Sequence, residues 1–202
     1  MARLPKSFYT RTNVVQISKE LLGKYLITNF KGQKTVGKIT ETEAYRAPDD
    51  KACHAYNNRK TERTKIMFEE GGTAYVYLCY GIHHLFNVVT AEAETAHAVL
   101  IRGLEPIENI DLMLERRKMK TLKPQLTSGP GVLSKALGIR TEHTGLSLTH
   151  ENSQIWIEDR GDFIDEKNII ASSRVGVGYA EECALWDWRF RIKNSKWTSP
   201  AK

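Results

Sequence analysis

Residues 39–106 constrain this chain most strongly, because polar and aromatic side chains there alternate with residues that favour β-strands. The run Tyr75-Val76-Tyr77-Leu78 is typical of the pattern. Successive side chains of a strand point to opposite faces of a sheet, so alternate positions share one face. The pattern predicts a rigid sheet that presents a carboxylate, a histidine, tyrosines, an asparagine and an arginine. We expect the functional site on that sheet.

Strands are expected on both sides of this stretch as well as within it. Residues 25–30 and 34–45 form an expected hairpin. Further strands are expected at residues 74–80, 85–90, 96–102, 153–158, 163–171 and 184–192. Apolar spacing predicts helices at 14–24, 104–120 and 132–137, whereas 52–68 should be an ordered loop with a helical turn. The pattern indicates the α+β class: a single domain over residues 1–202, with peripheral helices.

Length and composition limit the possible functions. The chain has 202 residues, of which 41% are hydrophobic, enough for one domain with a substantial core. No run of eighteen apolar residues is present, so we expect no membrane span, and no apolar core follows the N-terminal charges as a secretory signal requires. Three cysteines are an odd number, which favours reduced thiols and a cytoplasmic protein over a disulfide framework.

Positive charge points to a polyanionic partner. The formal net charge is +6, and basic residues cluster at 59–65, 116–123 and 189–196. Any one cluster taken alone could equally be a solvated face. Because two of them flank or follow the expected site, their placement favours a nucleic acid as the partner.

Several candidate site residues have a structural and a functional interpretation. The carboxylate of Glu43, on an otherwise apolar strand, is either a general base or the partner of a buried cation such as Arg102, and the ion pair is the commoner case. His54 could be an acid or base, an aromatic wall or a core histidine. Tyr77 and Tyr80 could be core aromatics or base-stacking rings, and Tyr80 precedes a glycine that can bend the chain and expose a ring.

Other site chemistries are disfavoured by spacing. Cysteines and histidines near the centre lack both the C-x-x-C and the H-E-x-x-H arrangement, so no metal site is expected. No G-x-S-x-G elbow is present, and Gly176-Val177-Gly178 lacks the third glycine of a dinucleotide fingerprint. Gly129-Pro130-Gly131 precedes a predicted helix, where free amides could hold a DNA phosphate, although simple helix capping explains it equally well.

Taken in order, the motifs resemble one family. Glu41-Thr42-Glu43-Ala44-Tyr45, Tyr75-Val76-Tyr77, Leu100-Ile101-Arg102, Ser128-Gly129-Pro130 and Arg174-Val175-Gly176-Val177-Gly178 closely resemble the alkyladenine (3-methyladenine) DNA glycosylases, over about residues 8–197. The resemblance implies a monofunctional base-excision enzyme with a curved, mostly antiparallel β-sheet. It also implies no metal or other cofactor, and a substrate of double-stranded DNA containing damaged purines. We expect a monomer without an obligate protein partner, because one duplex site needs only one pocket.

The resemblance assigns a role to each candidate residue. Glu43 matches the general base that activates a water, and Arg102 matches an arginine near that water. Tyr45, His54 and Tyr77 match the walls that sandwich the flipped base, Asn87 matches a residue that discourages the guanine 2-amino group, and Tyr80 matches the side chain that fills the gap in the duplex. Positions that match DNA contacts, or lie at the helix N-terminus discussed above, are Arg59, Thr61, Arg63, Met67, Ser128 and Gly129.

Substrate choice follows from the chemistry of flipping. Extruding a base costs a few kcal/mol, less when the base is damaged. Tyrosine faces favour a cationic alkylated purine by about 1–2 kcal/mol when desolvated. The expected substrates are 3-methyladenine, 7-methylguanine, hypoxanthine and ethenoadenine.

The alternative functions are a non-catalytic nucleic-acid-binding module of the same fold and a formyltransferase-type accessory domain that binds RNA. Arg46 could disfavour cationic bases or reach a phosphate.

Overall fold

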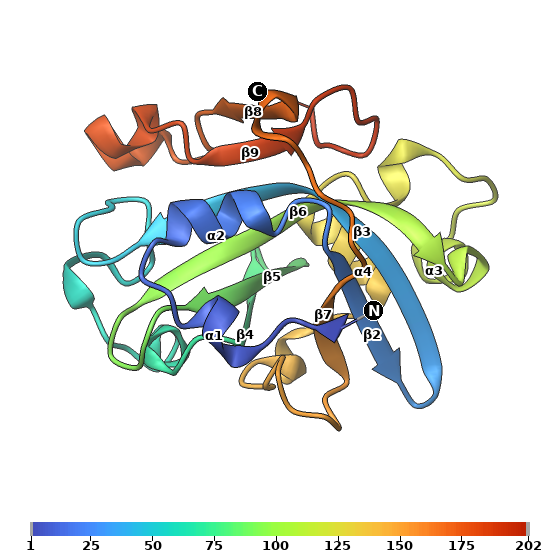
Figure 1. Cartoon of the computed structure of the whole chain (residues 1–202), viewed down its shortest axis with the longest axis horizontal. Helices are drawn as coiled ribbons and strands as arrows, with labels where there is room; N and C mark the ends of the chain where they lie inside the picture. Colours follow the sequence, from blue (N-terminus) through green and yellow to red (C-terminus); the bar gives the residue numbers. More distant parts are fainter. Residues whose placement is uncertain (1, 201–202) are drawn as a thin grey trace.

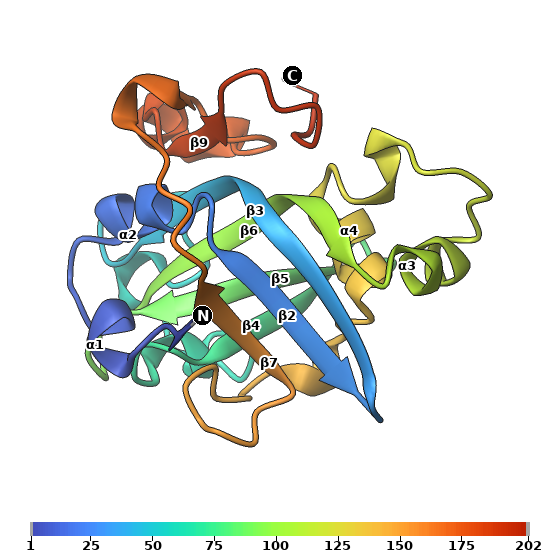
Figure 2. The same ribbon diagram turned by 45° about the vertical axis from the view of Figure 1, so that its right-hand side comes forward.

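Strand β3 (Gln33–Arg46) is the centre of the sheet in this computed structural model, which describes residues 2–200. Along one edge, β3 pairs with β6 (His97–Glu108). Along the other edge, its first half pairs with β2 (Tyr25–Phe30) and its second half with β9 (Arg189–Ile192). Because β2 pairs only as far as position 38, the edge of β3 at positions 41–43 is open to β9, which lies over that half of the strand (Figure 2).

The described residues form one nine-stranded sheet in which every strand pairing is antiparallel. Its main path runs β1-β7-β2-β3-β6-β5-β4, and β8 joins through β9. The remaining strands are β1 (Ala2–Arg3), β4 (Ala74–Cys79), β5 (His83–Thr90), β7 (Ile155–Asp159) and β8 (Ile169–Ser172). This arrangement confirms the α+β class and the antiparallel sheet predicted from the sequence.

The helices lie at the periphery of the sheet (Figure 1), as predicted. They are α1 (Lys6–Tyr9), α2 (Val14–Glu20), α3 (Ile110–Arg117) and α4 (Pro130–Leu137), with 3-10 turns at Tyr56–Asn58, Lys65–Phe68, Pro124–Leu126, Thr141–His143, Glu166–Asn168 and Gly178–Leu185. As expected, Pro130 occupies the first turn of α4 and Gly138 ends it with φ 78°. Within residues 2–200, no helix is long and apolar enough to cross a membrane.

The predicted helix at 104–120 is wrong in its first six residues and in its last three, because α3 ends at Arg117. Residues 104–108 continue strand β6, and helix α3 begins only at Ile110. The reason is the length of β3: its 14 residues give β6 a pairing edge that runs on to Glu108 opposite Val36. Leu104, fully buried opposite Ile39, satisfies a strand as well as a helix, so the available edge decided the outcome.

Two other predicted strands are shorter than expected. Residues 163–168 are not a strand, since Phe163 is 86% exposed and Asp165 caps a 3-10 turn by accepting from the Lys167 amide. Residues 184–188 are not a strand either. The 3-10 segment Gly178–Leu185 ends within them, and the irregular residues after it include Trp186 and Trp188, which pack with ring centroids 4.5 Å apart. β8 and β9 are four residues each, because β9 can pair only where the β3 edge is open.

Candidate active site

A cavity of about 630 Å³ opens between the β4–β5 hairpin, the loop of residues 52–67, the N-terminus of α4 and the loop after β8. Every residue predicted for the base pocket lines it: Tyr45, His54, Tyr77 and Asn87. Arg102 also lines the cavity, and so does Tyr80, from the hairpin turn. The strands of one sheet therefore bring together side chains that lie up to 57 positions apart in the sequence, between Tyr45 and Arg102.

Glu43 lies directly behind the cavity wall rather than on it. Its side chain is fully buried, and its hydrogen-bond partners Tyr45, Arg102 and Val175 line the cavity. Oε2 accepts from the Tyr45 hydroxyl at 2.8 Å and from Arg102 Nη1 at 3.3 Å, and Oε1 accepts from the Val175 amide at 2.8 Å. Glu43 thus forms the ion pair with Arg102 that the sequence favoured, and it does so next to the cavity.

The ring of Tyr45 is held from two directions. Its hydroxyl donates to Glu43, and burial followed by the negative charge of Glu43 raises the pKa of Tyr45 well above its usual value, so the hydroxyl stays protonated. The Arg174 guanidinium lies 4.8 Å from the centre of the Tyr45 ring and 5.4 Å from that of Trp188. Arg174 is itself fixed by a fully buried two-armed ion pair with Asp50. This arrangement makes Tyr45 a rigid wall.

His54 and Tyr77 form a second group of aromatic rings that lines the cavity. Their ring centroids are 4.7 Å apart at an interplanar angle of 72°, and His54 Nδ1 lies 2.9 Å from the Tyr75 hydroxyl. Burial, helped by the charge of Arg63, lowers the pKa of His54 to about 4, so the imidazole is neutral at neutral pH. Arg63 lies 3.4 Å from His54 Nε2 and 4.9 Å from the centre of the Tyr77 ring. Nε2 therefore accepts from Arg63, and Nδ1 donates to Tyr75.

Asn87 is held rigidly on β5. Its amide nitrogen donates to the Tyr75 carbonyl at 3.1 Å and to the Leu85 carbonyl at 3.3 Å, and the side chain is buried. With both amide hydrogens engaged, the side chain cannot turn away from an incoming base without losing two hydrogen bonds.

The β4–β5 hairpin carries an exposed apolar tip. Tyr80 is 91% exposed and Ile82 is 71% exposed, a large solvent-facing surface for two side chains of one turn. Tyr80 and Gly81 have φ angles of 51° and 73°, as a tight hairpin turn with two left-handed residues requires. The predicted break at Gly81 therefore does expose the Tyr80 ring.

The predicted DNA-contact residues occupy different environments. Arg63, Ser128 and Gly129 line the cavity, whereas Arg59 and Thr61 are exposed on the neighbouring loop and do not line it. The Thr64 hydroxyl shapes that loop by donating to the Arg59 carbonyl at 2.7 Å. Met67 lines the cavity from within the core and is only 2% exposed, so its contact with a ligand would be made inside the cavity rather than on the outer surface.

Sequence reasoning missed Glu41, Asp50, Arg174 as an aromatic-stacking cation, Arg189 and Ser199. The one available signal was that Glu41 and Glu43 are alternate residues of the same strand. Arg46 is an ion-pair partner of Asp49, with its guanidinium 4.9 Å from the centre of the Trp188 ring; it does not line the cavity. Within residues 2–200, no three His, Cys, Asp or Glu side chains are placed to hold a metal ion.

Comparison with known proteins decides the family. The sequence model of the family described as "Methylpurine-DNA glycosylase (MPG)" matches residues 7–196. The chain belongs to this family. It is 48% identical over 197 residues to a protein of Chlamydia felis named "Putative 3-methyladenine DNA glycosylase", covering 96% of this chain and 98% of that one. Proteins of the same name from Clostridium novyi and Bacillus mycoides are each 44% identical, covering 98% and 96% of this chain and 99% and 98% of theirs.

Membership of the methylpurine-DNA glycosylase family confirms the resemblance predicted from the sequence. The protein is therefore a DNA glycosylase, an enzyme whose substrate is DNA. A non-catalytic binding module and an RNA-binding accessory domain are set aside as alternatives. The roles of individual residues remain predictions.

Proposed function

We propose that this glycosylase removes alkylated and deaminated purines, among them 3-methyladenine, 7-methylguanine, hypoxanthine and ethenoadenine, after flipping them into the cavity. The observation that carries the proposal is the position of Glu43, a buried carboxylate directly behind a cavity walled by aromatic rings. The names of the relatives support 3-methyladenine as one of the bases.

The proposed binding step places the base between Tyr45 on one side and the His54–Tyr77 pair on the other. A flipped base leaves a gap in the duplex, which the exposed ring of Tyr80 would fill. Arg63 occupies part of the space near His54 and Tyr77, and it forms no ion pair with an acid within residues 2–200. A DNA phosphate would give Arg63 a partner outside the cavity, so binding DNA would clear the site for a cationic base.

The proposed chemical step is hydrolysis of the N-glycosidic bond. A water attacks C1′ and transfers a proton to Glu43, while the C1′–N bond breaks and its electron pair leaves with the purine. A cationic alkylated purine accepts that pair readily, so one base and one positioned water suffice. Arg102 and Tyr45 hold Glu43 in place through hydrogen bonds to the same oxygen, Oε2. Exclusion of normal guanine is assigned to the rigid amide of Asn87, by steric conflict with the 2-amino group.

The proposed DNA face includes Arg59 and Thr61 on one side of the cavity and Ser128 and Gly129 on the other. A second basic groove of about 540 Å³ lies beside the hairpin, and the cationic side chains that line it are Arg116, Arg117, Lys135 and Arg140. Within residues 2–200 none of these four forms an ion pair with an acid. Unpaired cations beside a wedge are suited to DNA phosphates.

The experiment that tests the proposal is base release from duplexes that each carry one lesion. Wild type and Glu43→Gln are compared under single-turnover conditions, with Glu151→Gln, an exposed glutamate outside the cavity, as the matched control. Removing a general base should lower the rate by about 10²–10⁴-fold while duplex binding remains. Release by Glu43→Gln within tenfold of wild type would remove Glu43 from the chemical step, and no release by wild type would overturn the proposed substrates.

A further inference from the structure

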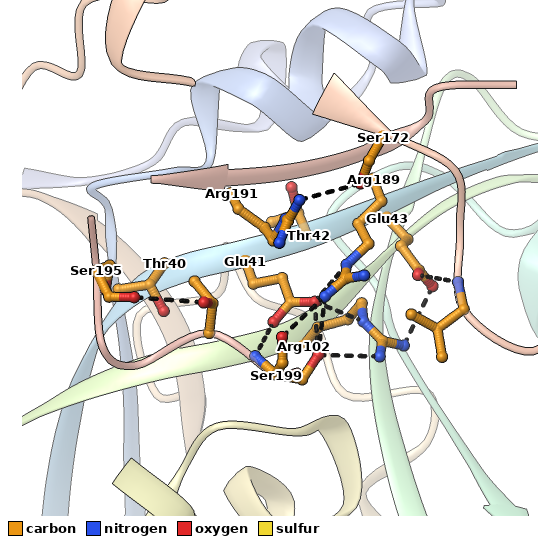
Figure 3. Close-up of polar contacts among 12 residues, drawn as sticks. Thr40, Glu41, Thr42, Glu43, Arg102, Ser172, Arg189, Arg191, Ser195 and Ser199 are labelled. Carbon is orange, nitrogen blue, oxygen red and sulfur yellow. Dashed lines mark hydrogen bonds and ion pairs between the residues drawn. The ribbon is translucent and has the colours of Figure 1, made fainter. Parts of the chain in front are cut away.

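Glu41 is a buried carboxylate that the proposed reaction does not use. Its side chain is fully buried and accepts hydrogen bonds from two arginines and one serine (Figure 3). Oε1 accepts from Arg102 Nε at 3.0 Å, from Arg189 Nε at 2.7 Å and from the Ser199 hydroxyl at 2.7 Å, while Oε2 accepts from the Ser199 amide. Burial alone would raise the pKa of Glu41, but the charge of Arg102, the hydrogen bond from the Ser199 amide and the charge of Arg189 keep it below its usual value.

Arg102 links this carboxylate to Glu43. Its Nε donates to Glu41, its Nη1 to Glu43 at 3.3 Å and its Nη2 to the Ser199 hydroxyl at 3.2 Å. All three nitrogens of the guanidinium are thus directed by fixed partners, and the contact with Glu41 is shorter than the contact with Glu43. Glu41 and Ser199 therefore determine how Arg102 approaches Glu43.

The C-terminal segment of residues 195–200 is built into this arrangement. The Trp197 carbonyl accepts from the Thr40 hydroxyl at 2.9 Å, and the Trp197 side chain is only 6% exposed. The backbone of Gly103 lies so close that a Cβ there would come within 2.6 Å of the same carbonyl oxygen. This contact coincides with the irregular pairing of β3 and β6 around Glu41. The segment thus lies against the two strands that carry Glu41, Glu43 and Arg102.

The charges of Glu41 and its partners affect how Arg102 pairs with Glu43. Of the two buried carboxylates, Glu41 pairs with both Arg102 and Arg189, whereas Glu43 pairs with Arg102 alone. If Glu41 were neutral, Arg102 would be free to make a two-armed pair with Glu43, the geometry that arginine prefers with carboxylates. A Glu43 so paired would bind a proton less readily and would be a weaker base.

We propose that Glu41, Arg189 and Ser199 form a positioning cluster that holds Arg102 to a single contact with Glu43 and keeps Glu43 free to take a proton. The C-terminal segment then contributes to catalysis although Glu41 and Ser199 do not line the base cavity. This inference rests on the proposed role of Glu43, and it assigns positioning residues for that role.

The first test compares Ser199→Ala with Thr198→Ala in the full chain. Thr198 is the matched control, because its hydroxyl donates only to the Ser195 carbonyl, at 3.3 Å. Single-turnover base release at saturating enzyme and duplex affinity are measured with a lesion that wild type excises. We expect Ser199→Ala to release base about tenfold more slowly at an affinity within about twofold of wild type, since small misplacements at a reacting centre cost rate rather than binding. Thr198→Ala should match wild type in both.

The second test is the pH dependence of the same rate in Glu41→Gln, with Glu41→Asp as the conservative variant. Because Glu41→Gln releases Arg102 toward Glu43, the acidic limb of the rate profile should move to lower pH and the plateau should fall by about 100-fold. Glu41→Asp should recover part of the plateau. If Glu41→Gln does not fold, as circular dichroism would show, Ser199→Ala and its own pH profile carry the test.

Two outcomes overturn the inference. The first is a rate of base release by Ser199→Ala within twofold of wild type. The second is a loss of rate that is matched by an equal loss of duplex affinity, with no shift in the pH dependence of the rate. The second outcome would make the cluster merely structural. Failure of the proposed function is separate, since it would appear in wild type and in the comparison with Glu43→Gln.

Discussion

Replacing Tyr80 with alanine should weaken binding to a lesion-containing duplex by about 30-fold. The ring is 91% exposed in the free protein, so nearly all of its surface is available to be buried between base pairs. Burying about 150 Å² of such a ring, at about 25 cal/mol per Å², gives an upper limit near 4 kcal/mol. Measured stacking of one aromatic ring on bases is about 1–3 kcal/mol. A central value of about 2 kcal/mol corresponds to about 30-fold in affinity.

Because Tyr80 is so exposed, replacing it should change binding without disturbing the fold. Little packs against Tyr80, and alanine would keep the left-handed turn as the tyrosine does, so the free energy of unfolding should change by less than about 0.5 kcal/mol. Affinity is measured in the Glu43→Gln background with a duplex containing ethenoadenine, whose fluorescence reports on unstacking. Tyr80→Phe is the control and should bind like the parent, because the ring rather than the hydroxyl fills the gap. Affinity of Tyr80→Ala within threefold of the parent would refute the wedge.

Three further predictions concern charges around the site. The pKa of His54, followed by NMR, should be about 4 and should rise in Arg63→Ala while staying below 6.5, because burial is the larger cause. Because the pKa of His54 in the folded protein lies below the unperturbed value of 6.5, the contribution of His54 to the free energy of unfolding is fully present above pH 6.5. About 3 kcal/mol of it is lost as the pH falls to 4. Urea unfolding of His54→Gln should not show that loss. Arg174→Met leaves the buried carboxylate of Asp50 without its ion-pair partner and should lower the free energy of unfolding by about 3–5 kcal/mol. Arg46→Met, which removes the more exposed ion pair with Asp49, should lower it by less than about 1 kcal/mol. Arg140→Gln should reduce the slope of log affinity against log salt concentration by about 0.9. An unchanged slope would mean that Arg140 does not contact a DNA phosphate.

The sequence predicted which side chains lie together around the cavity better than it predicted the bounds of the helices. Tyr75 and Tyr77 follow the two-residue repeat of a strand, and that repeat also sets which side of the sheet they occupy. Residues 104–108 were misjudged because their apolar spacing suits a helix and a strand alike. Their conformation depends on the length of β3, which is a partner in space rather than a neighbour in sequence.

The positioning cluster could not be predicted for a related reason. Glu41 meets Arg102, Arg189 and Ser199 across 61, 148 and 158 residues of sequence, and no local pattern specifies contacts over such separations. Buried charged side chains in this protein come from elements that the pairing of β3 brings together. A single sequence shows their charges but not which of them share a site.

Tyr45 belongs both to the cavity wall, which the alternation of a strand predicts, and to the contacts with Glu43 and Arg174. Its ring faces the cavity as strand alternation requires, while its hydroxyl donates to Glu43 and its ring packs against Arg174. A Tyr45→Phe variant would keep the wall and remove one of the three hydrogen bonds to Glu43. Base binding and base release should therefore separate at this position: affinity should stay near wild type while the pH dependence of release changes. A parallel change in both would mean that the wall and the carboxylate act as one unit.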